Sequence, residues 1–376
     1  MDHVAIVGAG IFGVTAALTL RARGCRVQLI DPGAPHPDAA STDISKVIRA
    51  DYGSDAFYSD LMQDAFAGWE RWNEAFPTPL YHQDGFLLMA GAPMEPGGFE
   101  HDSFHELKRR GYPVERLDAE ALASRFPAWA GAGYPDGYVN RRAGWAHSAA
   151  VVAALLAWCR RDGVERVAAR ATRVEPGLVT IEGGQELRAD TVVVAAGAWT
   201  PTLLPSLDDL MWATGQPVLH FRVDPAAFRP PHFLPWAADI SGSGWYGFPA
   251  KADGTLKVAN HGRGVRMDPR GPRAVAGDWP ARFRDFFDDK IPSLSGARHI
   301  ASRLCLYCDT FDGDLWIDRM DPGLVVAAGG SGHGFKFAPV LGDLIADAVF
   351  DTPGPFAPRF ARRERGPRRT EHARNA

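Results

Sequence analysis

The sequence is poor in cysteine, with four among its 376 residues. A chain of this length with so few cysteines lacks the disulfide framework on which small secreted domains depend. It also lacks an excess of basic residues, since its formal net charge is −4, so its charge gives no reason to expect nucleic acid or an anionic membrane as a partner. Its most apolar helical stretch, residues 149–159, is too short to cross a bilayer. Only Met1 and Asp2 precede the first apolar run, which leaves no room for a signal peptide, and we therefore expect a cytoplasmic protein.

Motifs for a metal centre are also missing. Cys305-x-x-Cys308 could be a redox pair or half of a zinc site, but no second CxxC spacing exists to complete a four-cysteine cluster. His101 and His105 share one helical face at i, i+4 without an HExxH pattern, and we interpret them as surface residues. The sequence therefore predicts no metal.

The first thirty residues carry a dinucleotide-binding pattern of strand, glycine turn, helix and strand. A short apolar strand at residues 3–7 is followed by Gly8-x-Gly10-x-x-Gly13, a helix expected at residues 14–23, and a second strand that ends at Asp31. Gly8 permits the tight turn, Gly10 lets the backbone approach a pyrophosphate, and Gly13 lets the helix pack closely on the strand. An acid at the end of the second strand is placed to accept from a ribose hydroxyl, which favours FAD or NAD over NADP.

Two later segments favour FAD. Residues 192–196 form a continuous apolar run that ends in a turn at Gly197, as expected for a buried parallel strand that reaches the edge of the sheet. Residues 325–337 again read as a strand, a glycine loop and the start of a helix. The glycines allow the backbone to approach a flat ring closely, and the positive end of the helix would stabilise an anionic reduced flavin.

With these segments, the chain resembles the amine-oxidising flavoenzymes grouped with D-amino-acid oxidase, and within them the branch of monomeric sarcosine oxidase. In that branch it is similar to the fructosyl amino acid oxidases (amadoriases), the saccharopine oxidases and the pipecolate oxidases. The motifs that carry the resemblance, beyond the glycine turn, lie at residues 43–52, 245–249, 256–257, 303–307 and 332–337. They occur in the same order as in the family and cover nearly the whole chain.

The resemblance implies roles for individual residues. Cys305 stands where the family bonds a cysteine covalently to the flavin, although an inert core cysteine remains an alternative. Lys257 stands where a lysine promotes the reaction with oxygen, and Arg49 and Lys336 match cations that bind the substrate carboxylate. The remaining expected catalytic residues are Tyr246, His261 and Tyr307. The expected cofactor-binding residues are Gly8, Gly10, Ile11, Phe12, Gly13, Asp31, Pro32, Lys46, Ala196, Gly197, Trp199, Cys305, Gly332, His333, Gly334, Phe335 and Lys336.

The chain departs from the family pattern at two positions. Sarcosine oxidases carry an arginine where this chain has Lys46. Amadoriases carry an acid near the position of His261, which weakens the case for a sugar amine as the substrate. Taken without the resemblance, isolated basic residues are usually solvated surface charges, and Tyr246 could be an aromatic residue of a core strand.

The expected fold is α/β, with a Rossmann-type FAD-binding domain and a mixed, β-rich substrate domain, both discontinuous in sequence. The FAD domain would combine residues 1–80, 143–207 and 312–376, and the substrate domain residues 81–142 and 208–311. A seven-arginine segment after residue 358 is expected to be a solvated, frayed tail.

The expected reaction is oxidation of the C–N bond of a secondary or cyclic amino acid by transfer of a hydride to FAD, which gives an imine and, after reaction with oxygen, hydrogen peroxide. We expect a monomer whose partners are a small-molecule amine or amino acid and oxygen. Two other classes stay open: a flavin-dependent dehydrogenase that passes its electrons to a carrier, and a nicotinamide-dependent oxidoreductase. A fructosyl amino acid oxidase is the alternative within the family.

Overall fold

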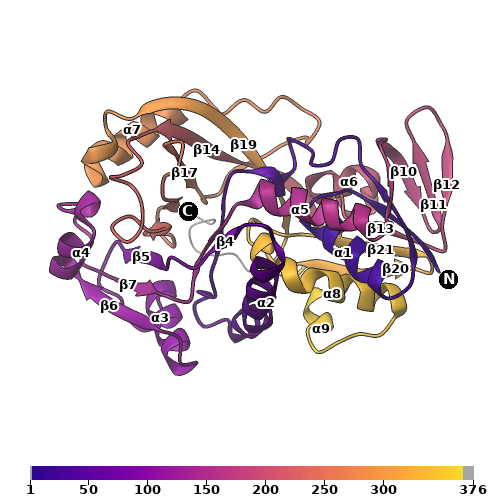
Figure 1. Ribbon diagram of the computed structural model, residues 1–376, viewed down its shortest axis with the longest axis horizontal. Helices are drawn as coiled ribbons and strands as arrows, with labels where there is room; N and C mark the ends of the chain where they lie inside the picture. The colour runs from indigo at the N-terminus through magenta and orange to yellow at the C-terminus, as the bar shows by residue number, and fades with distance from the viewer. Residues whose placement is uncertain (1, 367–376) are drawn as a thin grey trace.

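The computed structural model describes residues 2–366 and contains two large sheets that lie at opposite ends of the molecule (Figure 1). The first is six-stranded, and four of its five strand pairings are parallel while β20 pairs with β21 in the antiparallel sense. In order across the sheet its strands are β20 (Trp316–Asp321), β21 (Leu324–Ala328), β13 (Thr191–Val194), β1 (His3–Val7), β2 (Arg26–Ile30) and β9 (Glu165–Val167).

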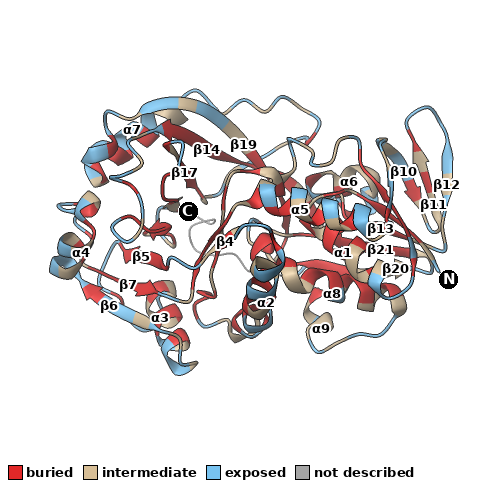
Figure 2. Ribbon diagram, viewed as in Figure 1, coloured by how far each residue is buried: buried red, intermediate tan, exposed pale blue. Residues whose placement is uncertain are grey.

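Both faces of this sheet are covered, which explains why its strands are apolar without alternation. Val4, Ile6 and Val193 share a core with three helices, α1 (Ile11–Ala22), α5 (Ser148–Arg161) and α8 (Ala338–Phe350). Ala5 and Val192 face the other way and pack on a small antiparallel sheet. That sheet comprises β10 (Ala171–Glu175), β11 (Leu178–Ile181) and β12 (Glu186–Arg188). The result is a three-layer arrangement in which the central strands β1, β13 and β21 are almost entirely buried (Figure 2).

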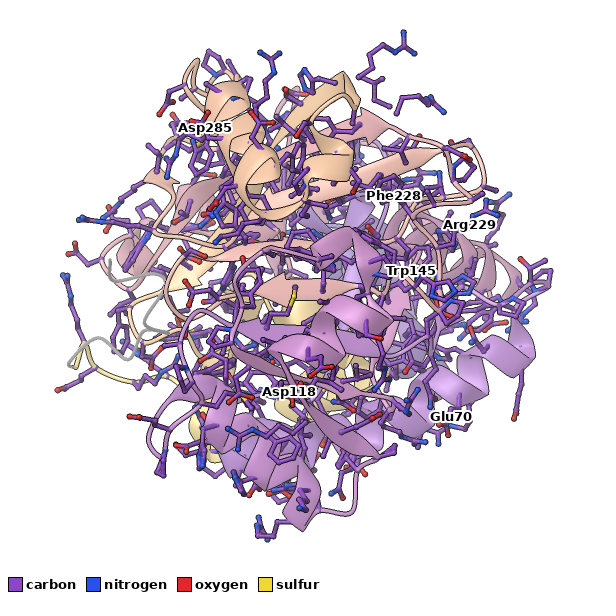
Figure 3. All side chains as sticks on the ribbon, turned by 90° about the vertical axis from the view of Figure 1, so that its left-hand side faces the viewer. Glu70, Asp118, Trp145, Phe228, Arg229 and Asp285 are labelled. Carbon is purple, nitrogen blue, oxygen red and sulfur yellow. The ribbon has the colours of Figure 1, made fainter. Side chains whose placement is uncertain are left out.

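The second sheet has nine strands and is mostly antiparallel. Its strands in order are β18 (Val265–Arg266), β14 (Met211–Arg222), β17 (Thr255–Asn260), β16 (Trp245–Gly247), β15 (Trp236–Ala238), β5 (Phe86–Ala90), β7 (Asp136–Asn140) and β6 (Val114–Asp118), with β19 (Arg298–Thr310) also paired to β14. One face packs on aromatic residues of α7 (Trp279–Lys290), among them Phe283 and Phe287, and on Trp129. Figure 3 views this end of the molecule, where Asp285 of α7 and Asp118 of β6 lie at the exposed periphery.

A second three-stranded sheet and several helices complete the described structure. This sheet has the order β3 (Lys46–Ile48), β8 (Gly144–Ala146) and β4 (Tyr81–His82). The remaining helices are α2 (Ala56–Ala75), α3 (Phe99–Arg109), α4 (Ala119–Arg125), α6 (Thr200–Leu203) and α9 (Ala357–Phe360). Six 3-10 turns complete the described part: η1 (Ala40–Thr42), η2 (Pro127–Trp129), η3 (Gly197–Trp199), η4 (Pro205–Leu207), η5 (Pro292–Leu294) and η6 (Gly334–Phe337).

The predicted α/β fold class is confirmed, and single elements differ from the prediction in their bounds. Helix α1 begins at Ile11, not at residue 14, because the last glycine of the turn already lies inside the helix. The boundaries of the two domains stay a prediction. The strands of the six-stranded sheet come from the segments assigned to the FAD domain, and those of the nine-stranded sheet from the other segments. Within residues 2–366, no helix is long and apolar enough to cross a membrane.

The expectation of a solvated basic tail is wrong for Arg359 and Arg363, whereas Arg362 and Arg365 are exposed. The Arg359 guanidinium forms hydrogen bonds with the carboxylates of Asp55 and Asp314, at 2.6–2.9 Å. Arg363 forms two bonds with Asp312, at 2.5 and 2.8 Å. Burial acts to lower the pKa of Arg359, but the carboxylates of Asp55 and Asp314 raise it above its usual value. Part of the tail is thus anchored, and the last three arginines of the segment, Arg368, Arg369 and Arg374, lie outside the described residues.

Candidate active site

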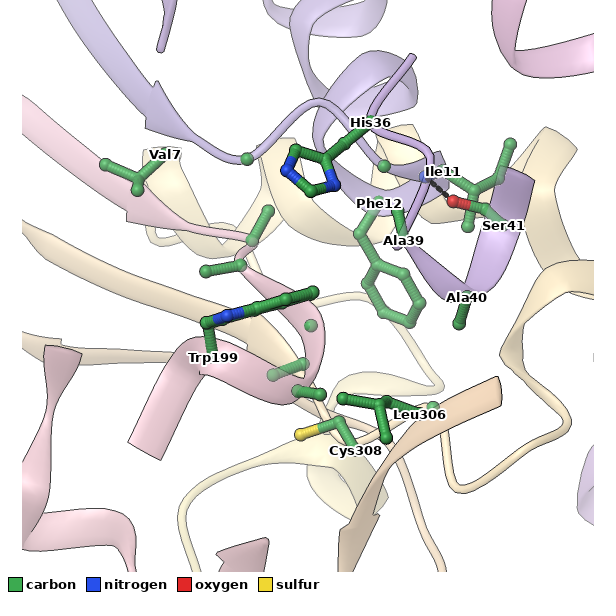
Figure 4. Close-up of a pocket in the computed structure, with 18 of the residues that line it drawn as sticks. Val7, Ile11, Phe12, His36, Ala39, Ala40, Ser41, Trp199, Leu306 and Cys308 are labelled. Carbon is green, nitrogen blue, oxygen red and sulfur yellow. Dashed lines mark hydrogen bonds between the residues drawn. The ribbon is translucent and has the colours of Figure 1, made fainter. Parts of the chain in front are cut away.

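A cavity of about 430 Å³ opens at the carboxyl ends of the parallel strands, beside the glycine turn (Figure 4). Most of the expected cofactor-binding residues line it. They are Gly8, Gly10, Ile11, Phe12, Asp31, Pro32, Lys46, Ala196, Gly197, Trp199, Gly332, Gly334 and Phe335. Ligands of open parallel sheets bind at this edge, so the position agrees with a dinucleotide site.

The glycine turn has the geometry that the motif predicts. Gly8 has a positive φ of 105°, and a Cβ atom on it would lie 2.5 Å from the carbonyl oxygen of Ala195. A Cβ atom on Gly13 would lie 1.8 Å from the carbonyl oxygen of Gly8, so this glycine packs the helix against the turn and does not line the cavity. The Asp31 carboxylate accepts from the backbone N–H of Ala9 and of Gly33, each at 2.9 Å, and thereby ties the second strand to the turn.

Several residues of this cavity carry no motif and were missed by the sequence analysis. Ser41 accepts a hydrogen bond from the backbone N–H of Ile11 at 3.2 Å, at the first turn of α1 (Figure 4). His36 is another, and its ring centre lies 6.0 Å from that of Trp199, an expected residue of the same wall. Arg170 of the segment before β10 also lines the cavity. These contacts join segments that are far apart in sequence, and no local spacing announces them.

A second, smaller cavity of about 80 Å³ adjoins the first, because Lys46, Tyr307, Gly332 and Phe335 line both. Its wall brings together most of the expected catalytic residues. They are Arg49, Tyr246, His261, Tyr307 and Lys336, and His333, which was expected to bind the cofactor, lines the same wall. The rest of its wall is mostly apolar and comprises Val47, Phe86, Ala237, Ile240 and Phe248.

Strand alternation explains how the nine-stranded sheet supplies this wall. Successive side chains of a strand point to opposite faces. In β15, Trp236 packs toward α7 and Ala237 lines the small cavity; in β16, Trp245 packs toward α7 and Tyr246 lines the cavity. In β17 the same rule places Lys257 on the face opposite to Leu256 and Val258.

Lys257 lies fully buried behind the cavity wall and forms an ion pair with Asp43. Its ammonium group donates to the Asp43 carboxylate at 2.5 Å and to the Ser45 carbonyl at 2.8 Å, and lies 4.6 Å from the centre of the Phe248 ring. Burial lowers the pKa of Lys257 to about 8, an effect that Asp43 opposes. The pKa of Asp43 lies well below its usual value although burial acts to raise it, because the cations Lys257, Lys46 and Arg303 and the imidazole of His220 surround the carboxylate.

Asp43 is a charged residue of the site to which the sequence analysis gave no role. It is almost completely buried and stands 3.7 Å from the ammonium of Lys46, which lines both cavities. Its backbone carbonyl accepts from the Ser148 hydroxyl and from the backbone N–H of Ala149, at the start of α5. A carboxylate held in this way links the buried lysine of the nine-stranded sheet to the wall of the cofactor cavity.

Two further cations, Arg49 and Lys336, line the small cavity. The Arg49 guanidinium lies 5.7–5.8 Å from the ring centres of Tyr52, Phe86 and Phe99 and donates to the backbone carbonyl of Asp51. Lys336 is buried, with 4% of its surface exposed, and its ammonium donates to the Tyr52 hydroxyl at 3.0 Å. Together with Lys46, these cations favour an anionic ligand in the small cavity, because buried charges of one sign are stabilised by an opposite charge.

Cys305 is buried on β19, and its sulfur lies 3.8 Å from the ammonium of Lys46. Alternation along the strand places Leu306 and Cys308 on the opposite side, where both line the cofactor cavity (Figure 4). Burial raises the pKa of the Cys308 thiol to about 12, which leaves it a poor nucleophile. A covalent bond between Cys305 and a flavin therefore stays a prediction, with Lys46 beside the sulfur as its support.

The fold and the cofactor cavity define a flavin-dependent oxidoreductase: the family model described as FAD dependent oxidoreductase (DAO) matches residues 3–348, and the chain belongs to this family. The residues around the large cavity fit FAD, since they combine a glycine turn that admits a close approach, an acid at the end of β2 and a largely apolar remainder.

Among individual proteins, the chain is 30% identical over 366 residues to the N-methyl-L-tryptophan oxidase of Salmonella arizonae, with 92% of this chain and 94% of that protein covered. The N-methyl-L-tryptophan oxidase of Salmonella heidelberg is 29% identical over 369 residues, with 93% and 95% covered. Among solved structures, amadoriase II (fructosamine oxidase) of Aspergillus fumigatus superposes with a TM-score of 0.82 at 23% identity, with 96% of this chain and 89% of that one covered. A modified fructosyl peptide oxidase of Aspergillus nidulans superposes with a TM-score of 0.83 at 19% identity, with 96% and 93% covered. The structural likeness establishes the fold.

Proposed function

We propose that the protein is an FAD-dependent amine oxidase that oxidises the C–N bond of a small secondary or cyclic amino acid and yields an imine and hydrogen peroxide. The observation that carries the proposal is the presence of Arg49 and Lys336 on the wall of a small apolar cavity that adjoins the cofactor cavity. The relatives named N-methyl-L-tryptophan oxidase support a substrate with a secondary amine and a carboxylate.

The size of the small cavity supports a small substrate. A water molecule needs about 10–15 Å³ of such space, so a cavity of about 80 Å³ has room for a ligand of roughly five to eight non-hydrogen atoms. Phe86, Ile240 and Phe248 favour an aliphatic chain or ring next to the carboxylate. An indole side chain or a sugar would have to displace part of this wall, which favours sarcosine, proline or pipecolate over N-methyltryptophan or a fructosyl amino acid.

The residues of the chain would divide the work as follows. Bound FAD supplies a hydride acceptor and the reaction with oxygen. The fork of Arg49 and the point charge of Lys336 would bind the substrate carboxylate and so orient the oxidised carbon. His261 and Tyr307, whose Nδ1 and hydroxyl lie 3.4 Å apart, would contact the amine, which must react as the neutral base. Lys257, held by Asp43, would provide the positive charge that favours electron transfer to oxygen.

Finer parts of the proposal rest on the sequence. They are the covalent bond to Cys305, oxygen as the physiological acceptor, the monomeric state and the cytoplasmic location. A flavin-dependent dehydrogenase that uses an electron carrier is the second candidate. The buried ammonium of Lys257 favours the oxidase, because a fixed positive charge stabilises the negative charge that oxygen gains with its first electron.

The experiment is an anaerobic screen of the purified yellow protein. Sarcosine, L-proline, L-pipecolate, N-methyl-L-tryptophan and fructosyl-glycine are mixed with it one at a time, and the loss of the oxidised-flavin absorbance is recorded. We expect the three small amino acids to reduce the flavin fastest, and dimethylamine and pyrrolidine, which lack the carboxylate, to be poor substrates. Peroxide is then measured under air with the best substrate. Reduction by the amines at the rate of the acids would contradict the proposal, and reduction without peroxide would favour the dehydrogenase.

A further inference from the structure

A chain of three hydrogen bonds begins at Lys336 and ends at a backbone carbonyl. The Lys336 ammonium donates to the Tyr52 hydroxyl at 3.0 Å. The same hydroxyl lies 3.0 Å from Nδ1 of His333, and Nε2 of His333 lies 2.9 Å from the carbonyl oxygen of Gly313. Lys336 and His333 line the small cavity, and Tyr52 stands behind them with 8% of its surface exposed.

The chemistry of its two ends fixes the direction of this chain. The carbonyl of Gly313 can only accept, so Nε2 of His333 must carry a hydrogen. A neutral imidazole has a single N–H, which leaves Nδ1 as an acceptor. The ammonium of Lys336 can only donate, so the Tyr52 oxygen accepts from it and the Tyr52 hydrogen is directed to Nδ1. All three donors therefore point the same way, and hydrogen bonds aligned in this manner strengthen one another.

Rings hold the middle of the chain in place. The Tyr52 ring stacks on Tyr58 at a centroid distance of 4.9 Å and lies 6.1 Å from Phe337. His333 meets Tyr58 edge-on at 5.0 Å. The Tyr58 hydroxyl points elsewhere and donates to Asp314 at 2.9 Å. The hydroxyl of Tyr52 is thus oriented by packing as well as by its hydrogen bonds.

The two buried lysines of the site differ in the charge of these partners. Lys257 donates to the carboxylate of Asp43 and is held in an ion pair. Lys336 donates to the Tyr52 phenol, which is in turn hydrogen-bonded to the His333 imidazole. These bonds orient the Lys336 ammonium at the wall of the small cavity.

We propose that Tyr52 and His333 are positioning residues for substrate binding: with His333 neutral and protonated on Nε2, they hold the Lys336 ammonium at the cavity wall where it binds the substrate carboxylate. This inference rests on the proposed function, which assigns the carboxylate to Lys336. In this inference, Tyr52 and His333 increase the affinity for the substrate carboxylate and take no part in the oxidation step.

The test uses the flavin-containing enzyme with propionate as the probe, and binding is followed by the change in flavin absorbance. Tyr52→Phe keeps the ring stack and removes the hydroxyl. We expect it to raise the dissociation constant of propionate by about tenfold, which corresponds to about 1.4 kcal/mol. With the best amino-acid substrate, it should raise KM by a similar factor and change kcat by less than about twofold. Tyr58→Phe, which removes the neighbouring hydroxyl outside the chain, is the matched control and should bind propionate as the wild type does.

Substitutions of His333 test the direction of the chain. The amide oxygen of asparagine can take the place of Nδ1 as an acceptor, so His333→Asn should keep propionate affinity close to that of the wild type. Leucine offers no acceptor, and His333→Leu should resemble Tyr52→Phe. Nitrogen-15 NMR of labelled histidine should show His333 as the neutral Nε2–H tautomer.

The outcomes separate this inference from the proposed function. If the wild type binds propionate and Lys336→Met abolishes binding, the carboxylate site stands. In that case, any one of three results would overturn the inference. They are an unchanged propionate affinity in Tyr52→Phe, equal losses of affinity in His333→Asn and His333→Leu, and an Nδ1–H tautomer of His333. If the wild type does not bind propionate, or Lys336→Met binds it equally well, the proposed function itself fails and the positioning role fails with it.

Discussion

Replacing Asp43 by asparagine removes the negative charge that faces Lys257 and keeps the shape of the side chain. In the wild type, burial lowers the pKa of Lys257 to about 8, and Asp43, 2.5 Å away, opposes this fall. Removing one partner of a buried ion pair costs about 3–5 kcal/mol, and one pKa unit corresponds to about 1.4 kcal/mol. We therefore expect the pKa of Lys257 in Asp43→Asn to fall by at least about two units, to about 6 or lower.

The sign of the pH dependence follows from the charge of the lysine. Lys257 is an ammonium below its pKa and a neutral amine above it. If the ammonium promotes the reaction with oxygen, reoxidation of the reduced wild type slows as the pH rises through about 8. In Asp43→Asn it should slow as the pH rises through a value about two units lower. At neutral pH the wild type would then still react quickly and the variant slowly.

The assay reduces the enzyme anaerobically, mixes it with oxygenated buffer in a stopped-flow instrument from about pH 5 to pH 10, and follows the return of flavin absorbance. Lys257→Met should be slow at every pH, and Asp43→Glu, which keeps a carboxylate, should retain a midpoint closer to that of the wild type. A midpoint in Asp43→Asn that equals or exceeds the wild-type value would refute the role of the ion pair, and pH-independent reoxidation in all variants would remove Lys257 from the oxygen reaction.

Three further predictions concern the cofactor, the substrate and stability. Acid-denatured wild type and Cys308→Ser should keep their yellow colour, whereas Cys305→Ser should release it; free release from the wild type would exclude a covalent bond at Cys305. Arg49→Ala should raise KM for amino-acid substrates by at least about tenfold, a loss of about 1.4 kcal/mol, as measured by steady-state kinetics, and a smaller change would argue against its contact with the carboxylate. Arg359→Met leaves two partly buried carboxylates without their partner and should lower the free energy of unfolding in urea by about 2–4 kcal/mol; an unchanged unfolding midpoint would show that the ion pairs contribute nothing net.

The cofactor side of the site was predictable because its signal is local. Gly8, Gly10 and Asp31 lie within one strand–helix–strand unit, where spacing alone specifies which backbone atoms meet. The structure places all three on the wall of the large cavity.

The partners of the buried charges were not predictable in this way. Asp43 and Lys257 are 214 residues apart in sequence, and no local pattern says that they meet. One signal was present: a charged residue between Leu256 and Val258 interrupts an otherwise apolar strand, and such a charge requires a partner. The anchoring of Arg359 was missed for the same reason, because composition predicts a solvated tail and contains no information about acids that other segments bring close.

The two cavities share one strand, and this limits how their sizes can change. Along β19, Leu306 and Cys308 line the cofactor cavity alone, while Tyr307 between them also lines the substrate cavity. The strand is paired with β14 through most of its length, so its register is fixed. Loss or gain of one residue in this stretch would exchange the two sets of side chains at once and damage both sites. Substrate range can therefore be altered here by substitution but not by insertion or deletion, and a library that varies loop lengths to enlarge the substrate cavity should leave residues 302–310 at their present length.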